Sequence, residues 1–122
     1  MASMKVNNND VSRWGIYNIK KKIDKNNFII KNVVEKPSIK ASPSNNAVIG
    51  RYILPKTIFS KLKSLKPGKS GEFHITDAIQ ALIEDEHQFI GHNFSGKYLD
   101  CGTMKGYIES TLEISKQWNF AW

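Results

Sequence analysis

The sequence has little of several features that define large classes of protein. Its single cysteine, Cys101, excludes an intramolecular disulfide, fits a reducing compartment and is expected to be a small buried side chain. No apolar run approaches the roughly 20 residues that a membrane-spanning helix needs, and no secretory signal pattern opens the chain. These absences favour a cytoplasmic protein that does not enter a membrane.

Residues that bind nucleotides, metals or nucleic acids are also scarce. A phosphate-cradling glycine loop of either usual pattern is missing from the 122 residues. The three histidines lack the spacing of zinc ligands. The net charge is +7, but it comes from lysine, with only two arginines to form forked contacts to bases and phosphates. The lysines are therefore interpreted as solvated surface, and no nucleic-acid partner is expected.

The remaining composition suits one compact domain, because 40% of the residues are hydrophobic. We expect a disordered leader or an expression remnant at residues 1–9, one folded unit at residues 10–117 and an aromatic tail at residues 118–122. The aromatic side chains of the tail either dock onto a partner subunit or pack back on the last helix.

Strand-like and helix-like patterns alternate along the folded unit. The segments with strand patterns are 14–19, 28–34, 47–54, 89–94 and 97–99. The segments with helical patterns are 55–65, 76–83 and about 103–117. Thr76 is expected to cap the second helix, and Ser95-Gly96 is expected to join the last two strands as a hairpin. The interleaving predicts an α/β fold with a mixed sheet and flanking helices.

The last predicted helix has an apolar face formed by Met104, Ile108 and Leu112. Residues four apart lie on one side of a helix, and such a side ordinarily faces the core. We therefore expect these three side chains to be buried.

An acid and a base stand together in Glu35-Lys36-Pro37, at the end of a predicted strand. A carboxylate can accept hydrogen bonds from sugar hydroxyls, and an ammonium group can neutralise a phosphate. Neighbouring strand side chains point to opposite faces, so both reach one ligand only if it straddles the strand end or the backbone bends there. Pro37 is expected to keep Lys36 extended. Gly15 interrupts another strand pattern, which a bulge or a close ligand approach would explain.

Asp100 precedes a glycine and a predicted helix. The α/β sheets place ligands at the carboxyl ends of strands, and a carboxylate there suits Mg²⁺, which binds through one or two acids together with phosphate oxygens and waters. A helix N-cap is an equally good interpretation of the same side chain. Both remain open from this segment alone.

Taken together and in order, several motifs resemble the bacterial UTP–glucose-1-phosphate uridylyltransferases. The motifs are DVSRWGI at 10–16, VEKP at 34–37, SNNAVIGRYIL at 44–54, KPG at 66–68, GE at 71–72, TDAI at 76–79, YLDCG at 98–102 and KGY at 105–107. The resemblance covers about residues 10–117. The order and spacing of the motifs make it far more specific than any one of them.

The resemblance implies part of a Rossmann-like nucleotide-diphospho-sugar transferase fold. Enzymes of this family join UTP and glucose 1-phosphate into UDP-glucose and pyrophosphate, using Mg²⁺. The resemblance implies that Glu35 contacts the sugar hydroxyls, that Gly15 lets the backbone approach the sugar, and that Lys36 contacts the sugar-linked phosphate. It places Asp100 at the metal. Catalysis in such an enzyme is mostly positioning and charge neutralisation, which makes Lys36 the catalytic candidate.

Two departures from the family shape the functional hypothesis. The family's glycine-rich nucleotide loop, its uracil-reading residues and its first metal-binding acid are not found, so we expect a sugar-binding part that is inactive without a complementary amino-terminal segment. Thr103 stands where these enzymes usually carry an acid, whereas the related thymidylyltransferases have an Asp-x-Gly-Thr pattern similar to the one at residues 100–103. The alternatives are therefore part of a thymidylyltransferase-like enzyme, or a non-catalytic module. A homo-oligomer is expected because an incomplete sheet exposes strand edges.

Overall fold

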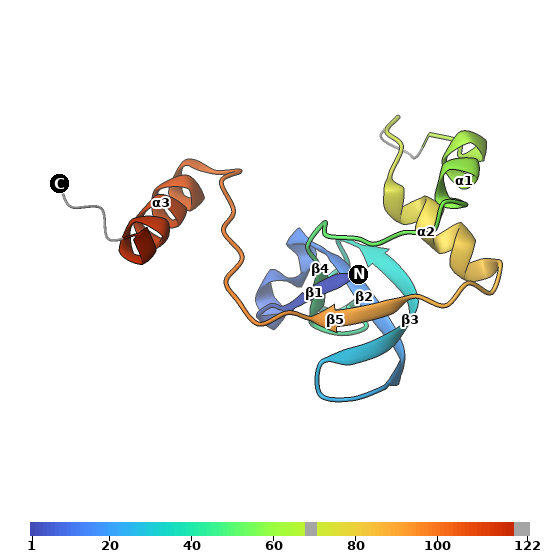
Figure 1. Cartoon of the computed structure of the whole chain (residues 1–122), viewed down its shortest axis with the longest axis horizontal. Helices are drawn as coiled ribbons and strands as arrows, with labels where there is room; N and C mark the ends of the chain where they lie inside the picture. Colours follow the sequence, from blue (N-terminus) through green and yellow to red (C-terminus); the bar gives the residue numbers. More distant parts are fainter. Residues whose placement is uncertain (68–70, 119–122) are drawn as a thin grey trace.

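The computed structural model describes residues 1–67 and 71–118. Figure 1 shows a small curved sheet, a helical pair beside it and a third helix that stands apart. The strands are β1 (Ala2–Lys5), β2 (Gly15–Lys22), β3 (Asn27–Glu35), β4 (Asn46–Val48) and β5 (Ile90–Asn93). The helices are α1 (Ile58–Ser64), α2 (Ile75–Glu84) and α3 (Met104–Trp118), with short 3-10 helices η1 (Asn8–Arg13) and η2 (Ile39–Ala41). None of the helices in the described part is long and apolar enough to cross a membrane.

The strands form a mixed sheet in the order β1-β4-β2-β3-β5. β1 pairs antiparallel with β4 and parallel with β5, so the curved sheet closes on itself. β2 and β3 form its long hairpin, and Asp24 holds the turn by accepting hydrogen bonds from the amides of Asn26 and Asn27 at 2.8 and 2.9 Å. The mixed sheet with flanking helices that the sequence predicts is confirmed.

Strand β1 differs from the disordered leader expected at residues 1–9. Ser3 is buried and lies in register with Val48 on β4 and with Asn93 on β5. The Tyr17 hydroxyl donates a hydrogen bond to the carbonyl of Ala2 at 3.2 Å. Polar composition suggested a loose start, but pairing with two strands that are distant in sequence gives this segment a fixed structure.

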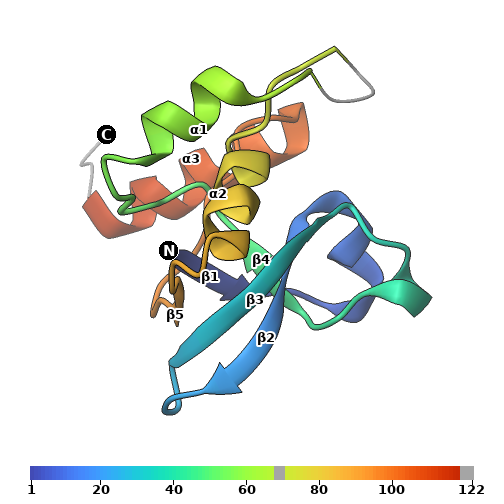
Figure 2. The ribbon, with the colours of Figure 1, turned by 90° about the vertical axis from the view of Figure 1, so that its right-hand side faces the viewer.

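The core lies between the sheet and the helical pair (Figure 2). α2 packs along β3 and α1 packs on α2. The apolar face of α2 contributes Ala78, Ile79 and Leu82, all buried. The helix begins at Ile75, one residue before the expected cap, so the prediction that Thr76 caps it is wrong.

The hairpin expected at residues 89–99 is not formed. β5 is its only strand, and residues 94–103 run as an extended arm from β5 to α3 (Figure 1). Both edges of β5 are already paired, with β3 and with β1, so a strand returning after Ser95-Gly96 has no edge to join.

Helix α3 has the predicted bounds but not the predicted burial. Thr103 caps it, since its Oγ1 accepts a hydrogen bond from the Gly106 amide at 3.0 Å. Met104, Ile108 and Leu112 are 75%, 52% and 56% exposed, so the expectation that they are buried is wrong. Periodicity shows that the three share a face, but it cannot show whether anything covers that face. Of the aromatic tail, only Trp118 lies within the described residues.

The core makes a testable prediction about Tyr17. Burial, and after it the charge of Tyr52, raises the pKa of the Tyr17 phenol. Because the folded pKa exceeds the unfolded value of about 10, this contribution to stability is fully present below about pH 10 and is lost as the pH rises further. At neutral pH we expect the unfolding free energy of Tyr17→Phe to be about 1 kcal/mol lower than that of wild type, because the hydrogen bond is lost. As the pH is raised above about 10, the unfolding free energy of Tyr17→Phe should fall less than that of wild type. Urea unfolding across this range tests it.

The matched control is Tyr107→Phe, because this phenol is exposed. It should leave both the neutral stability and the alkaline decline unchanged. An identical alkaline decline in Tyr17→Phe and wild type would contradict the assignment to Tyr17.

Candidate functional site

Two of the residues predicted to contact a sugar lie side by side in the sheet. Gly15 on β2 and Glu35 on β3 are paired in register, at the start of one strand and the end of the other. A Cβ atom added at Gly15 would lie 2.9 Å from Oε2 of Glu35. The carboxylate therefore lies over the glycine, and a larger residue at position 15 would displace it. The pairing of distant residues in a hairpin creates this arrangement.

The backbone bends at Lys36, where β3 has just ended. Its φ of 43° is in the left-handed region that side-chain-bearing residues rarely adopt, so the extended conformation expected before Pro37 is not found. The Lys36 amide donates a hydrogen bond to the carbonyl of Trp14 at 3.0 Å, which holds the bend. Such a bend is the condition under which neighbouring acid and base can reach one ligand.

Tyr52 belongs to the same region, although sequence reasoning did not single it out. Burial raises the pKa of its phenol, and the negative charge of Glu35 raises it further. The carboxylate and the half-buried phenol are thus close enough to interact electrostatically. The only available signal was its place within the motif at 44–54.

Asp100 lies on the arm, half-buried. Its Oδ1 accepts a hydrogen bond from the Gly102 amide at 2.9 Å, so the side chain caps a turn, whereas Thr103 caps helix α3. Asp100 also lines a surface depression of about 610 Å³, together with Arg13, Lys97 and Lys105. The interpretation of Asp100 as the N-cap of the helix is wrong, because Thr103 occupies that position.

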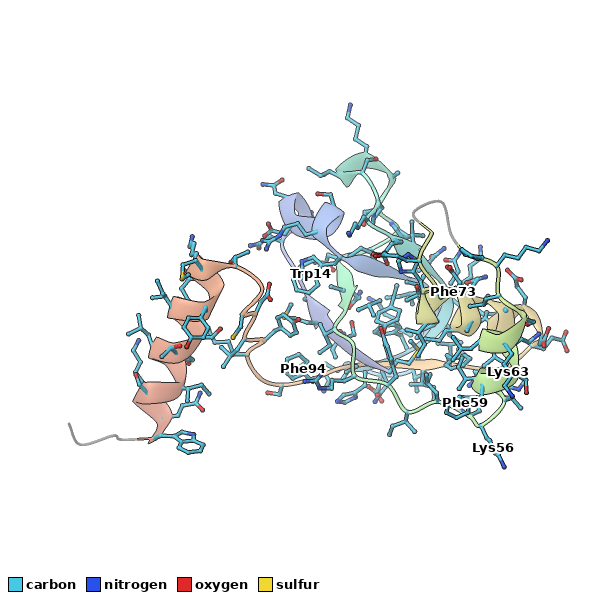
Figure 3. The ribbon with its side chains drawn as sticks, turned by 90° about the horizontal axis from the view of Figure 1, so that it is seen from above. Trp14, Lys56, Phe59, Lys63, Phe73 and Phe94 are labelled. Atoms are coloured by element: carbon cyan, nitrogen blue, oxygen red, sulfur yellow. The ribbon has the colours of Figure 1, made fainter. Side chains whose placement is uncertain are left out.

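Trp14 links the two groups of residues. The carbonyl of Trp14, the residue labelled in Figure 3, accepts the hydrogen bond from Lys36. The ring of Trp14 meets the ring of Tyr98 edge-on, with centroids 5.3 Å apart. Tyr98 lies on the arm, two residues before Asp100. Glu35 and Lys36 do not line the depression that contains Asp100. The structure therefore brings Gly15 and Glu35 together, with the Lys36 backbone beside them, and Trp14 connects this group to the arm that carries Asp100.

The acid on the arm can supply only part of a metal site. In residues 1–67 and 71–118, no group of three or more histidine, cysteine, aspartate or glutamate side chains could hold a metal ion. One Asp100 carboxylate oxygen is used by the Gly102 amide. The donor set therefore fits a cation that takes its other ligands from phosphates, waters and a second acid.

Two other candidates play no part in this arrangement. Cys101 is exposed, so the expectation of a small buried thiol is wrong. His92 has its Nδ1 2.8 Å from Oδ1 of Asn27, beside the hairpin turn of β2 and β3. It is a surface histidine with a structural partner.

Comparison with known proteins places the chain in a protein family. A family model described as nucleotidyl transferase matches residues 1–117, and the chain belongs to this family. Within it, the chain is similar to the UTP–glucose-1-phosphate uridylyltransferase of Pseudomonas aeruginosa, with 45% identity over 84 residues that make up 69% of this chain and 30% of the relative. The resemblance identified from the motifs is confirmed.

Solved structures agree with this placement. A UDP-glucose pyrophosphorylase in complex with UDP-glucose matches 95% of this chain and 43% of its own, with a TM-score of 0.86 and 40% identity. The UTP-bound enzyme from Acinetobacter baumannii matches 96% of this chain and 39% of its own, with a TM-score of 0.81 and 28% identity. The chain thus spans less than half the length of these relatives.

Proposed function

We propose that this chain is the sugar-binding part of an enzyme that joins UTP and glucose 1-phosphate into UDP-glucose and pyrophosphate. One observation carries the proposal: the Glu35 carboxylate lies over Gly15, next to the bend at Lys36. The relatives named as uridylyltransferases support this substrate pair over the thymidylyl alternative.

Each residue has a distinct role in this proposal. The Glu35 carboxylate accepts hydrogen bonds from sugar hydroxyls, and Gly15 leaves the space that the sugar needs against the strand. The Lys36 ammonium neutralises the sugar-linked phosphate, which attacks the α-phosphorus of UTP in line. The bend at Lys36 lets both side chains act on one ligand.

Mg²⁺ supplies charge neutralisation at the phosphates when it is bound. Asp100 would hold it with its free carboxylate oxygen, and a second acid would come from the nucleotide-binding part of the enzyme. The 122 residues contain no glycine-rich nucleotide loop, so we propose that turnover requires such a complementary part. We infer that assembly with it, rather than self-association, completes the enzyme.

Substitution at Gly15 tests the sugar site. The nearest atom to an added Cβ is the flexible end of Glu35, so Gly15→Ala should leave the thermal midpoint almost unchanged. It should weaken UDP-glucose binding about tenfold or more, because the displaced Glu35 carboxylate loses its charge-assisted hydrogen bonds to the sugar hydroxyls. Isothermal titration calorimetry with UDP-glucose measures the effect.

Two further variants complete this experiment. Glu35→Gln should weaken binding to a similar degree, whereas Glu72→Gln, at an exposed glutamate elsewhere, should not change it. Equal affinity in wild type and Gly15→Ala would contradict the sugar site. Formation of UDP-glucose by this chain without any partner would contradict the proposed incompleteness.

A further inference from the structure

Helix α3 carries a row of apolar side chains that are exposed. We define its outer face as Met104, Tyr107, Ile108 and Leu112, which recur at spacings of three and four residues and are all exposed. Residues at these spacings form one continuous stripe on a helix. A stripe of this kind ordinarily faces a core, so its exposure calls for a partner surface.

The opposite side of α3 packs on the arm through small and polar groups. Ser110 is only 6% exposed, and a Cβ at Gly106 would lie 2.1 Å from the backbone oxygen of Asp100. Nζ of Lys97 on the arm lies 2.8 Å from Oε2 of Glu113 on the helix. The helix is therefore positioned by its polar side, which leaves the outer face free to meet another surface.

Helix α3 stands apart from the sheet and from α1 and α2, joined to them by the arm (Figure 1). The solved complex with UDP-glucose matches 95% of this chain, while the match makes up only 43% of that chain. A helix held at this distance from its own core fits a fold in which additional polypeptide lies beside it.

We propose that the outer face of α3 is the surface on which the nucleotide-binding part of the same fold docks. This inference rests on the proposed function, and it adds the place of contact. Docking there would bring the second part to the helix that directly follows Asp100, the residue assigned to the phosphates and Mg²⁺. A second copy of this chain is the competing occupant, but it would bring no nucleotide loop to the site.

Co-expression provides the test. A tagged form of this chain is produced together with the residues of the Pseudomonas aeruginosa uridylyltransferase that this chain does not span, and the untagged partner retained on the tag is quantified. The double variant Ile108→Glu, Leu112→Glu places two charges on the outer face and should reduce the retained partner at least tenfold. Gln117→Glu adds a charge to an exposed position on the other side of the same helix and should retain as much partner as wild type.

Three outcomes would overturn the proposal. The partner is not retained by the wild-type chain, or the double variant retains it fully. Alternatively, sedimentation shows a dimer of this chain that the double variant dissociates, with no partner bound. The assay contains no substrate, so it is independent of the sugar site. A Lys36→Ala chain that retains the partner but forms no UDP-glucose supports both proposals, whereas retention with unchanged turnover sinks only the assignment of Lys36.

Discussion

Gly91→Ala is expected to remove much of the stability of the sheet. Gly91 on β5 is in register with Phe28 on β3, and an added Cβ would lie 2.2 and 2.3 Å from Cε2 and Cζ of that ring. The ring cannot swing away, because Phe28 is buried and packs against Tyr17 with centroids 5.8 Å apart. Overpacking of this kind costs about 1–3 kcal/mol. We expect the thermal midpoint to fall by roughly 5–15 °C, measured by circular dichroism.

A double-mutant cycle distinguishes steric overlap from other causes. Phe28→Leu shortens the side chain that meets the new methyl group, so Gly91→Ala should cost much less in that background than in wild type. Gly50→Ala is a useful comparison, because no atom lies within 4 Å of its added Cβ and any loss there comes from its positive φ. Equal costs of Gly91→Ala in both backgrounds would refute the steric explanation.

Gly106→Ala is expected to disturb the arm while leaving the sheet intact. An added Cβ would lie 2.1 Å from the backbone oxygen of Asp100, and a backbone carbonyl cannot rotate away as a side chain can. The arm or the start of α3 must therefore shift, which moves Asp100. In the assembled enzyme we expect turnover to fall about 100-fold, the effect of a displacement of about 1 Å at a reacting centre.

Hydrogen exchange locates this second effect. The Gly102 and Tyr107 amides, which donate to Asp100 Oδ1 and to the Thr103 carbonyl, should exchange at least tenfold faster in Gly106→Ala. Amides of β2 and β3 should keep their protection. Glu109→Ala, on the same helix, controls for a general change in helix stability. Unchanged exchange at both amides would show that the arm tolerates the methyl group.

The parts of the fold that depend on neighbouring residues could be predicted from the sequence. The strands β2 and β3 follow from the alternating pattern at residues 14–19 and the β-branched run at residues 28–34, and the bounds of α3 follow from its periodicity and the preceding Thr103. The identity of Glu35, Lys36 and Asp100 as candidates came from their residue types and motifs. Their roles remain predictions.

The parts that depend on distant residues could not be predicted. β1 is fixed by partners more than 40 residues away, and no local pattern distinguishes it from a loose terminus. The bend at Lys36 opposes the usual effect of Pro37 and depends on the carbonyl of Trp14. The position of Glu35 over Gly15 is a matter of strand register, which residue types alone do not give.

The parallel pairing of β1 with β5 has a consequence for how the molecule is made. Ser3 meets Asn93 in this ladder, so β1 leaves the ribosome long before β5 and has only one of its two sides bonded until β5 follows. Closing so long a loop is slow, because chain entropy must be lost before the contacts form. During synthesis the nascent chain thus passes through a stage with an open strand edge, the stage at which chaperones and aggregation compete for it.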